Sequence, residues 1–275
     1  MLRRAWVFRA RWAIMLLVTW ACHSLASLVH GDDHGSLPLA VAAIIAVSAL
    51  IASIVGFAFC ALAGTAFAFL GVDPVEAVRT MILCSTGIQL YAVWRIRHAI
   101  RWSALGPMLA AGALMVPVGV WLLLHVDATL YGVGLGVFLS AYGLFTVFRR
   151  DDLVVSGSAW RDAGAGALGG LAGGVAGLSG SFVTIWCSMR GWGKDAQRAV
   201  YQPFIAVMQI WTLVCLRLLA ARHAPLLEGL RFVPFALLAG IAGFAIYERM
   251  THAQFRAVVS ALLLLSGLGL LARTL

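Results

Sequence analysis

The chain has 275 residues, of which 62% are hydrophobic and only 11% are charged, and its mean hydropathy is +0.95. This composition excludes an ordinary soluble domain and indicates a helical protein that crosses a membrane several times. The net charge of +9 does not indicate a nucleic-acid-binding protein, because the cationic residues cluster in short loops between apolar runs, as in the cytoplasmic loops of membrane proteins.

The histidines and cysteines form no pattern that indicates a metal site or a disulfide framework. Residues 30–34 read HGDDH and offer two imidazoles and two carboxylates to a cation. We interpret them as a solvated acidic loop, because no predicted element holds these ligands in place. We interpret the cysteines as small buried hydrophobic residues within apolar segments: Cys22, Cys60, Cys84, Cys187 and Cys215. We therefore expect no metal and no cofactor.

The chain begins with four arginines within residues 3–11, followed by the apolar segment Trp12–Val29. A cleaved signal peptide has a similar layout, but this apolar part is long and no clear A-x-A cleavage site is present. We favour an uncleaved helix with its N-terminus in the cytoplasm. Residues 1–38 are assigned to this membrane segment and to the outside loop after it.

Apolar runs continue to the end of the chain. The run Leu39–Leu70 is too long for one span and too short for two, and Gly56 divides it into Leu39–Gly56 and Phe57–Leu70. The other predicted spans are Thr80–Trp94, Leu105–Leu124, Ala128–Phe148, Ala199–Leu216, Phe232–Tyr247 and Phe255–Ala272.

A glycine-rich stretch, Gly164–Arg198, stands out between these spans. Gly169, Gly173 and Gly177 recur every four residues, so on a helix they form a stripe that lets a neighbouring backbone approach closely. Residues 178–181 (LSGS) should interrupt the helix, and the apolar segment Phe182–Met189 is too short to cross a bilayer. The pattern predicts a discontinuous helix of the kind that marks substrate sites in transporters. A tightly packed, kinked helix is the alternative.

The two halves of the chain have the same order of segments: one long, one short, then three spans. Glycine and glutamine positions repeat at offsets of about 120 to 124 residues: Gly71 with Gly191, Gln89 with Gln209, Gly119 with Gly243, and Gly143 with Gly267. We assign residues 39–148 to repeat one, 149–162 to a cytoplasmic linker and 163–275 to repeat two.

The distribution of Lys and Arg predicts the orientation. If each short segment turns back to the side from which it came, 15 of the 20 Lys and Arg residues lie inside. The five outside are Arg79, Arg217, Arg222, Arg231 and Arg273. If each long and short pair crosses once, the split is even. The positive-inside rule favours the first arrangement, in which the two repeats are inverted, a frequent transporter design.

No charged residue lies in the middle of a predicted span, which argues against a relay of intramembrane carboxylates. The predicted substrate site uses hydroxyls, amides and the free N–H groups at the helix start after the break: Ser179, Gly180, Ser181, Arg198, Gln202, Gln209, Gln89 and Ser85. Arg198 and Arg79 either draw an anion to this site or anchor helix ends at the membrane interface. The glutamines either bind the substrate or join helices.

The chain contains no Walker A sequence, no HExxH and no G-x-S-x-G motif, so an enzyme has no support. Instead, the glycine pattern from Gly169 to Gly180, with Gly191 and the segment Arg198–Phe204 (RAVYQPF), resembles the TauE/SafE sulfite exporter family over about residues 39–275. The resemblance implies transport of a small sulfur-containing anion. It is less close in repeat one, where Phe57–Cys60 replaces the glycine cluster.

The sequence therefore predicts an all-helical, multi-pass protein of the inner membrane with inverted repeats, broken helices and an additional N-terminal helix. Its expected function is secondary transport of sulfite or an organosulfonate by alternating access. The alternative is a non-transporting scaffold or accessory subunit with the same fold. The partners expected are a small anion and the lipid bilayer, without nucleic acid. The anion, the direction, the coupling ion and the oligomeric state stay open.

The charge count generates a test of topology. In a background without the five native cysteines, Ile100→Cys and Gly157→Cys should be protected from a membrane-impermeant thiol reagent in intact cells, because both positions are predicted to face the cytoplasm. Both should react in inverted vesicles. Labelling of Ile100→Cys from outside would contradict the arrangement in which the short segments turn back.

Overall fold

The computed structural model describes residues 36–55, 59–148, 154–219 and 227–247, with isolated positions near the C-terminus. All regular elements in these residues are helices, which confirms the predicted fold class for this part of the chain. The predictions for Trp12–Val29, for residues 30–34 and for Gly56 lie outside the described residues, as does most of Phe255–Ala272.

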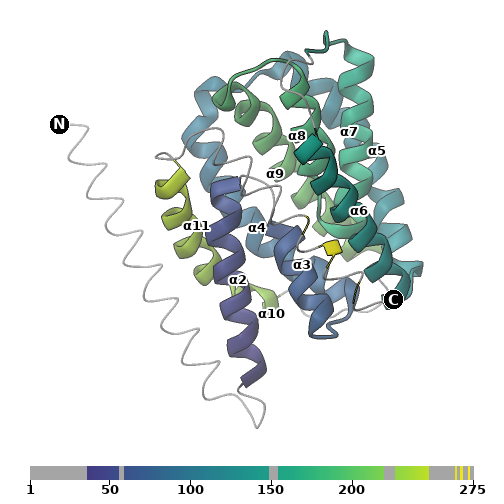
Figure 1. The fold of residues 1–275 in the computed structure, drawn as a ribbon, viewed down its shortest axis with the longest axis vertical. Coiled ribbons are helices and arrows are strands. Elements are labelled where there is room, and N and C mark those ends of the chain that lie inside the picture. Colours follow the sequence, from purple (N-terminus) through teal and green to yellow (C-terminus); the bar gives the residue numbers. More distant parts are fainter. Residues whose placement is uncertain are drawn as a thin grey trace, which may run out of the picture.

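Figure 1 shows the helices in chain order. They are α2 (Ser36–Val55), α3 (Phe59–Phe69), α4 (Pro74–Ile96), the 3₁₀ turn η1 (Arg97–Ala99), α5 (Trp102–His125), α6 (Ala128–Phe148), α7 (Ala159–Ala176), α8 (Gly180–Met189), α9 (Lys194–Leu219), α10 (Leu227–Leu230) and α11 (Val233–Tyr247). Among the described helices, three segments are long and apolar enough to cross a bilayer unaided: Trp102–His125, Ala128–Phe145 and Asp195–Leu219. The predicted span Ala128–Phe148 is reproduced, whereas α9 begins five residues before the predicted Ala199 because its first turn is charged.

The break after α7 is a true interruption of the helix. Gly177 adopts a left-handed conformation, with φ of 71°, and its N–H bonds the carbonyl of Gly173 at 2.8 Å. Such a terminus favours glycine, which has no Cβ to clash in this conformation. The discontinuous helix is therefore confirmed, and a merely kinked helix is wrong. Gly177 ends α7 and is not a member of a continuous helical stripe, contrary to the prediction.

The short helix α8 brings the chain back to the beginning of α7. The Val155 N–H donates to the Met189 carbonyl at 2.7 Å, and Arg190 pairs with Asp162 at 2.8 Å. Helices α7 and α8 thus form a hairpin in which the beginning of α7 lies beside the end of α8. Because α7 begins at Ala159, the last residues of the predicted linker 149–162 form its first turn.

The first half of the chain has the same sequence of elements. Helix α3 is followed by Gly71, with φ of 69°, just as α8 is followed by Gly191, with φ of 65°. Helix α4 then begins at Pro74, and the Asp73 carboxylate accepts the N–H of Val75 at 3.0 Å and that of Glu76 at 3.2 Å. Asp73 therefore satisfies donors that the helix leaves free.

Glycines hold the helices at close range. Helix α5 packs along α7, α11 packs along α2, and α4 lies against α9 between these pairs (Figure 1). The contact of α7 with α5 is made by a stripe of glycines that the sequence analysis did not single out: Gly166, Gly170 and Gly174 face the α5 backbone at Met108, Gly112 and Val116. The predicted pair Gly169 and Gly173 instead faces Ser179, the residue directly before α8.

The close packing of α7 on α5 generates a test of stability. A Cβ at Gly170 would lie 2.7 Å from the Gly112 Cα, so Gly170→Ala must push two backbones apart. We expect a loss of about 1–3 kcal/mol, typical of overpacking, measured as a lower unfolding midpoint in detergent.

The matched control is Gly164→Ala on the same helix, where an added Cβ meets no atom within 4 Å. It should be neutral or stabilising by up to about 1 kcal/mol, because alanine favours a helix over glycine. Equal midpoints for the two variants would show that α5 and α7 are not in close contact.

Candidate functional site

The two interrupted helices meet at their breaks. A Cβ at Gly177, directly before α8, would lie 3.0 Å from the Sγ of Cys60 in the first turn of α3 and 3.3 Å from the Cγ1 of Ile82 on α4. The N-termini of α3 and α8 therefore converge on one region inside the protein. Each N-terminus carries a partial positive charge and N–H groups, and such ends bind anions.

The side chain of Ser179 brings a hydroxyl group to this junction. Ser179 is completely buried, and its Oγ makes no hydrogen bond with the described residues. The Ser181 hydroxyl instead donates to the Leu178 carbonyl at 2.8 Å. The sequence analysis treated the two serines alike, but the structure leaves only the Ser179 hydroxyl available to a ligand.

A polar face of α9 lies in the same interior. Arg198, Gln202 and Gln209 are four and seven residues apart, which places them along one side of the helix, and all three are buried. The Gln209 amide donates to the Ser85 hydroxyl of α4 at 2.8 Å, so this pair joins the central helices of the two halves. Gln202 Oε1 and Gln209 Oε1 have no hydrogen-bond partner among the described residues.

Two of the predicted polar residues lie on α4 and reach the junction from the other half. Ser85 is one helical turn from Ile82, which contacts the break at Gly177, and Gln89 follows after another turn. Both side chains are buried. The structure thus brings polar residues from α4, α8 and α9 into one interior, although the direct contact that it shows among them is the one between Ser85 and Gln209.

Arg198 lies inside the protein and not on its surface. Only 3% of the residue is exposed, and its guanidinium donates to the Ser53 carbonyl at 3.3 Å and to the Tyr201 hydroxyl at 3.2 Å. The Ser53 carbonyl belongs to the last described turn of α2. Arg198 therefore joins α9 to this end of α2.

A comparison with protein families decides what kind of molecule this is. The family model of the sulfite exporter TauE/SafE matches residues 40–270. The chain belongs to the TauE/SafE family. This confirms the resemblance drawn from the glycine pattern and from Arg198–Phe204, and it assigns the chain to a family of membrane transporters of sulfite and sulfonate-type anions. Searches among curated proteins and among solved structures found no match.

This TauE/SafE protein also has a polar cluster that sequence reasoning missed. At the end of the α7–α8 hairpin that lies away from the break, Asp162 accepts a hydrogen bond from the Trp186 indole at 2.6 Å and pairs with Arg190. The Arg190 guanidinium lies 4.6 Å from the ring centre of Trp192, and that of Arg101 lies 5.0 Å from the same ring. The cluster fastens the end of α8 to α7 and to the beginning of α5. Asp162 was assigned to the cytoplasmic linker, so no sequence signal predicted its burial.

Arg79, the other cation proposed to attract an anion, stands in the second turn of α4, one helical turn before Ile82. Its guanidinium lies 3.6 Å from the carboxylate of Glu76, which is exposed. Both roles predicted for Arg79, attraction of an anion and anchoring of the helix end, stay predictions.

The burial of Arg198 generates a prediction. Arg198→Gln should lower the stability of the protein by about 1.5–3 kcal/mol, the usual value of a hydrogen bond to a charged group, because the bond between α9 and the Ser53 carbonyl of α2 is lost. The loss should depend little on ionic strength, since buried charges are poorly screened.

The measurement is the unfolding midpoint in detergent at low and high salt. Arg97→Gln is the control, because the exposed Arg97 guanidinium donates to the Trp94 carbonyl at the surface, and it should change stability by less than about 1 kcal/mol. A loss for Arg198→Gln that disappears at high salt would show that the guanidinium is accessible to solvent.

Proposed function

We propose that this TauE/SafE protein is a secondary transporter that moves sulfite or an organosulfonate across the inner membrane, and that the junction of the two helix breaks is its substrate site. The observation that carries the proposal is the convergence of the N-termini of α3 and α8 beside Ser179, whose buried hydroxyl has no partner among the described residues. Transporter helices of this discontinuous kind direct their N-termini at anionic substrates.

The chemistry of the junction suits a sulfur oxyanion. The oxygens of sulfite and of a sulfonate accept hydrogen bonds, and the Ser179 hydroxyl, the helix N–H groups and the amides of Gln202 and Gln209 are donors. Arg198 contributes a buried positive charge that remains bonded to Ser53. Donors and helix ends of this kind replace the hydration shell of the anion, and no negatively charged side chain is placed among these candidate residues.

We further infer that the two halves are inverted repeats, because their contacts follow one symmetry. A Cβ at Gly119 would meet Leu171 and Gly174, and a Cβ at Gly243 would meet Leu50 and Ser53. The glycines are 124 residues apart in the sequence, and both pairs of partners are 121 residues apart. Gly143 meets Leu264 while Gly267 meets Ser140, which is the reciprocal contact expected across a twofold axis.

The directions of the helices support inversion over a simple duplication. The cation–π contact of Arg101 with Trp192 places the end of the α4–η1 segment beside the beginning of α9. Helices α4 and α9, which are equivalent in the two halves, therefore run in opposite directions. Inverted repeats allow two conformations of similar energy that open the site to opposite sides, which is the basis of alternating access.

The structure supports a closed state in this cycle. Ser179 and Gln202 are buried, so an anion reaches them only when helices move apart. The cluster of Asp162, Arg190 and Trp186 joins the beginning of α7 to the end of α8. Opening of the protein at this end of the hairpin would have to separate the hairpin from α5 or from α9. The inner-membrane location rests on the charge distribution of the sequence.

The substrate site can be tested by uptake of labelled sulfite or sulfonate into proteoliposomes. Ser179→Ala should weaken apparent substrate affinity by about 1 kcal/mol, or by up to about 3 kcal/mol if the bond is to the charged anion, because it removes an available donor. Gly180→Val should abolish transport, since its side chain would occupy the approach to the helix N-terminus.

Ser188→Ala is the matched control on the same helix, because the Ser188 hydroxyl donates to the Ile185 carbonyl within α8. It should transport like the parent protein. Wild-type transport by Gly180→Val, at an equal protein level, would place the substrate elsewhere. Transport of no sulfur anion, together with no thermal stabilisation by sulfite or sulfonates, would favour the scaffold alternative.

A further inference from the structure

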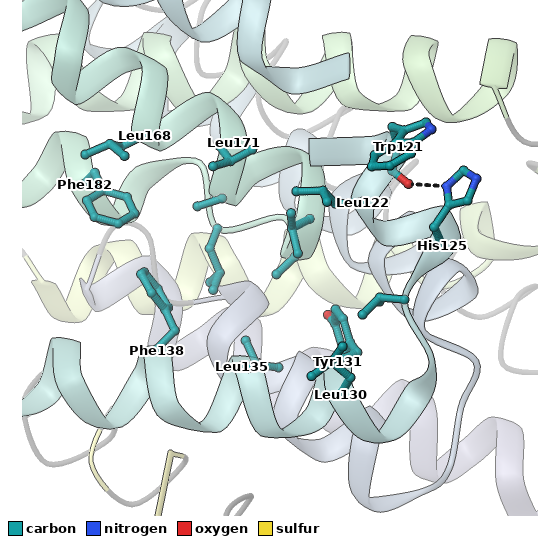
Figure 2. Close-up of a pocket in the computed structure, with 16 residues that line it drawn as sticks. Trp121, Leu122, His125, Leu130, Tyr131, Leu135, Phe138, Leu168, Leu171 and Phe182 are labelled. Carbon is teal, nitrogen blue, oxygen red and sulfur yellow. Dashed lines mark hydrogen bonds between the residues drawn. The ribbon is translucent and has the colours of Figure 1, made fainter. Parts of the chain in front are cut away.

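A slot of about 660 Å³ lies between α6 and the α5–α7–α8 layer. Figure 2 shows α6 along one wall, and the opposite wall is formed by α7 and by the end of α5. Its volume is within the range of small-molecule binding sites. The lining is almost wholly apolar, with Leu135 of α6 and Leu178 of the α7–α8 break in its floor.

The slot is open towards the surrounding membrane. Its rim is formed by apolar side chains that are exposed on the surface of the protein: Trp121, Leu122, Leu130 and Leu168. Such side chains face lipid in a protein of this class, so hydrocarbon has direct access from the side. At the inner end, the rings of Phe138 and Phe182 lie 5.5 Å apart and close the slot between α6 and α8.

The polar groups of the slot gather at its other end, next to the turn between α5 and α6. His125 lies there, and its ring Nδ1 donates to the Trp121 carbonyl at 2.7 Å (Figure 2). Tyr131 is 93% buried, and its hydroxyl makes no hydrogen bond with the described residues. Because protein atoms cover this hydroxyl, the exposed His125 imidazole is the polar group that a ligand can reach at this end of the slot.

The length of the slot matches one leaflet of a bilayer. It runs along α6 from Leu130, near the start of the helix, to Phe138, a rise of about 12 Å. The hydrocarbon core of one leaflet is about 15 Å thick, half of the usual 30 Å. A slot with a polar end at the interface and an apolar end near the midplane fits a molecule of the same polarity.

We propose that the slot binds one acyl chain of a phospholipid from the leaflet on the side of the α5–α6 turn, with the headgroup of this lipid at the His125 end of the slot. The chain lies against Leu178, which lines the slot. The site takes a lipid and not the transported anion, so it does not depend on the proposed substrate.

The test uses the full-length protein in detergent, titrated with dioleoylphosphatidylethanolamine and followed by native mass spectrometry. Gly134 lines the slot, and a Cβ there would meet no atom within 4 Å, so Gly134→Phe fills the space without a clash. We expect it to weaken binding of the first lipid at least about ten-fold. Gly164→Phe, at an equally open helical glycine outside the slot, should bind like the parent.

Gly134→Leu adds a smaller side chain in the same space and should also weaken binding of the first lipid. This variant decides the question if Gly134→Phe proves unstable by size-exclusion chromatography. Unchanged lipid binding in a folded Gly134→Phe or Gly134→Leu would overturn the proposal. Displacement of the lipid by octanesulfonate would also overturn it, because the slot would then hold the apolar tail of a substrate.

Discussion

Every backbone N–H and C=O inside a bilayer needs a partner within the protein, and this requirement explains the construction of the molecule around its two helix breaks. At the first break, Arg198 reaches from α9 to the Ser53 carbonyl at the end of α2. At the second, the Gly177 N–H bonds back to α7, and Ser181 bonds the Leu178 carbonyl. The carbonyls of Ser53, Gly173 and Leu178 are thus satisfied by the chain itself, whereas the Ser179 hydroxyl has no partner among the described residues and is available as a donor.

Close packing of glycines makes these buried breaks possible. Each hairpin must lie against helices that cross the membrane, and a side chain at Gly170 or Gly119 would separate the backbones that enclose it. The same contacts repeat in both halves at nearly constant offsets. We infer that the glycines serve the symmetry as well as the packing. Two equivalent interfaces of similar strength allow the protein to change between two conformations that open to opposite sides of the membrane.

Much of this arrangement could be predicted from the sequence, because membrane segments follow simple rules of length and polarity. The break at residues 178–181, the short return and the family were identified from their glycine and serine pattern. The environment of single charges could not be predicted. Arg198 and Asp162 stand near the ends of apolar runs and read as surface residues, but tertiary contacts with Ser53 and Arg190 bury them. The stripe at Gly166 was missed because two overlapping four-residue periods occupy the same helix.

The two charged groups that the structure buries have different consequences for an anion. The Asp162 carboxylate is neutralised by Arg190 where α7 begins and α8 ends. An unpaired negative charge there would repel an incoming anion. Arg198 donates to the Ser53 carbonyl and to the Tyr201 hydroxyl, so its guanidinium is fixed in place and joins α9 to α2. A transport site must attract its substrate and still release it on the other side, which favours a neutral donor such as the Ser179 hydroxyl over a full ion pair.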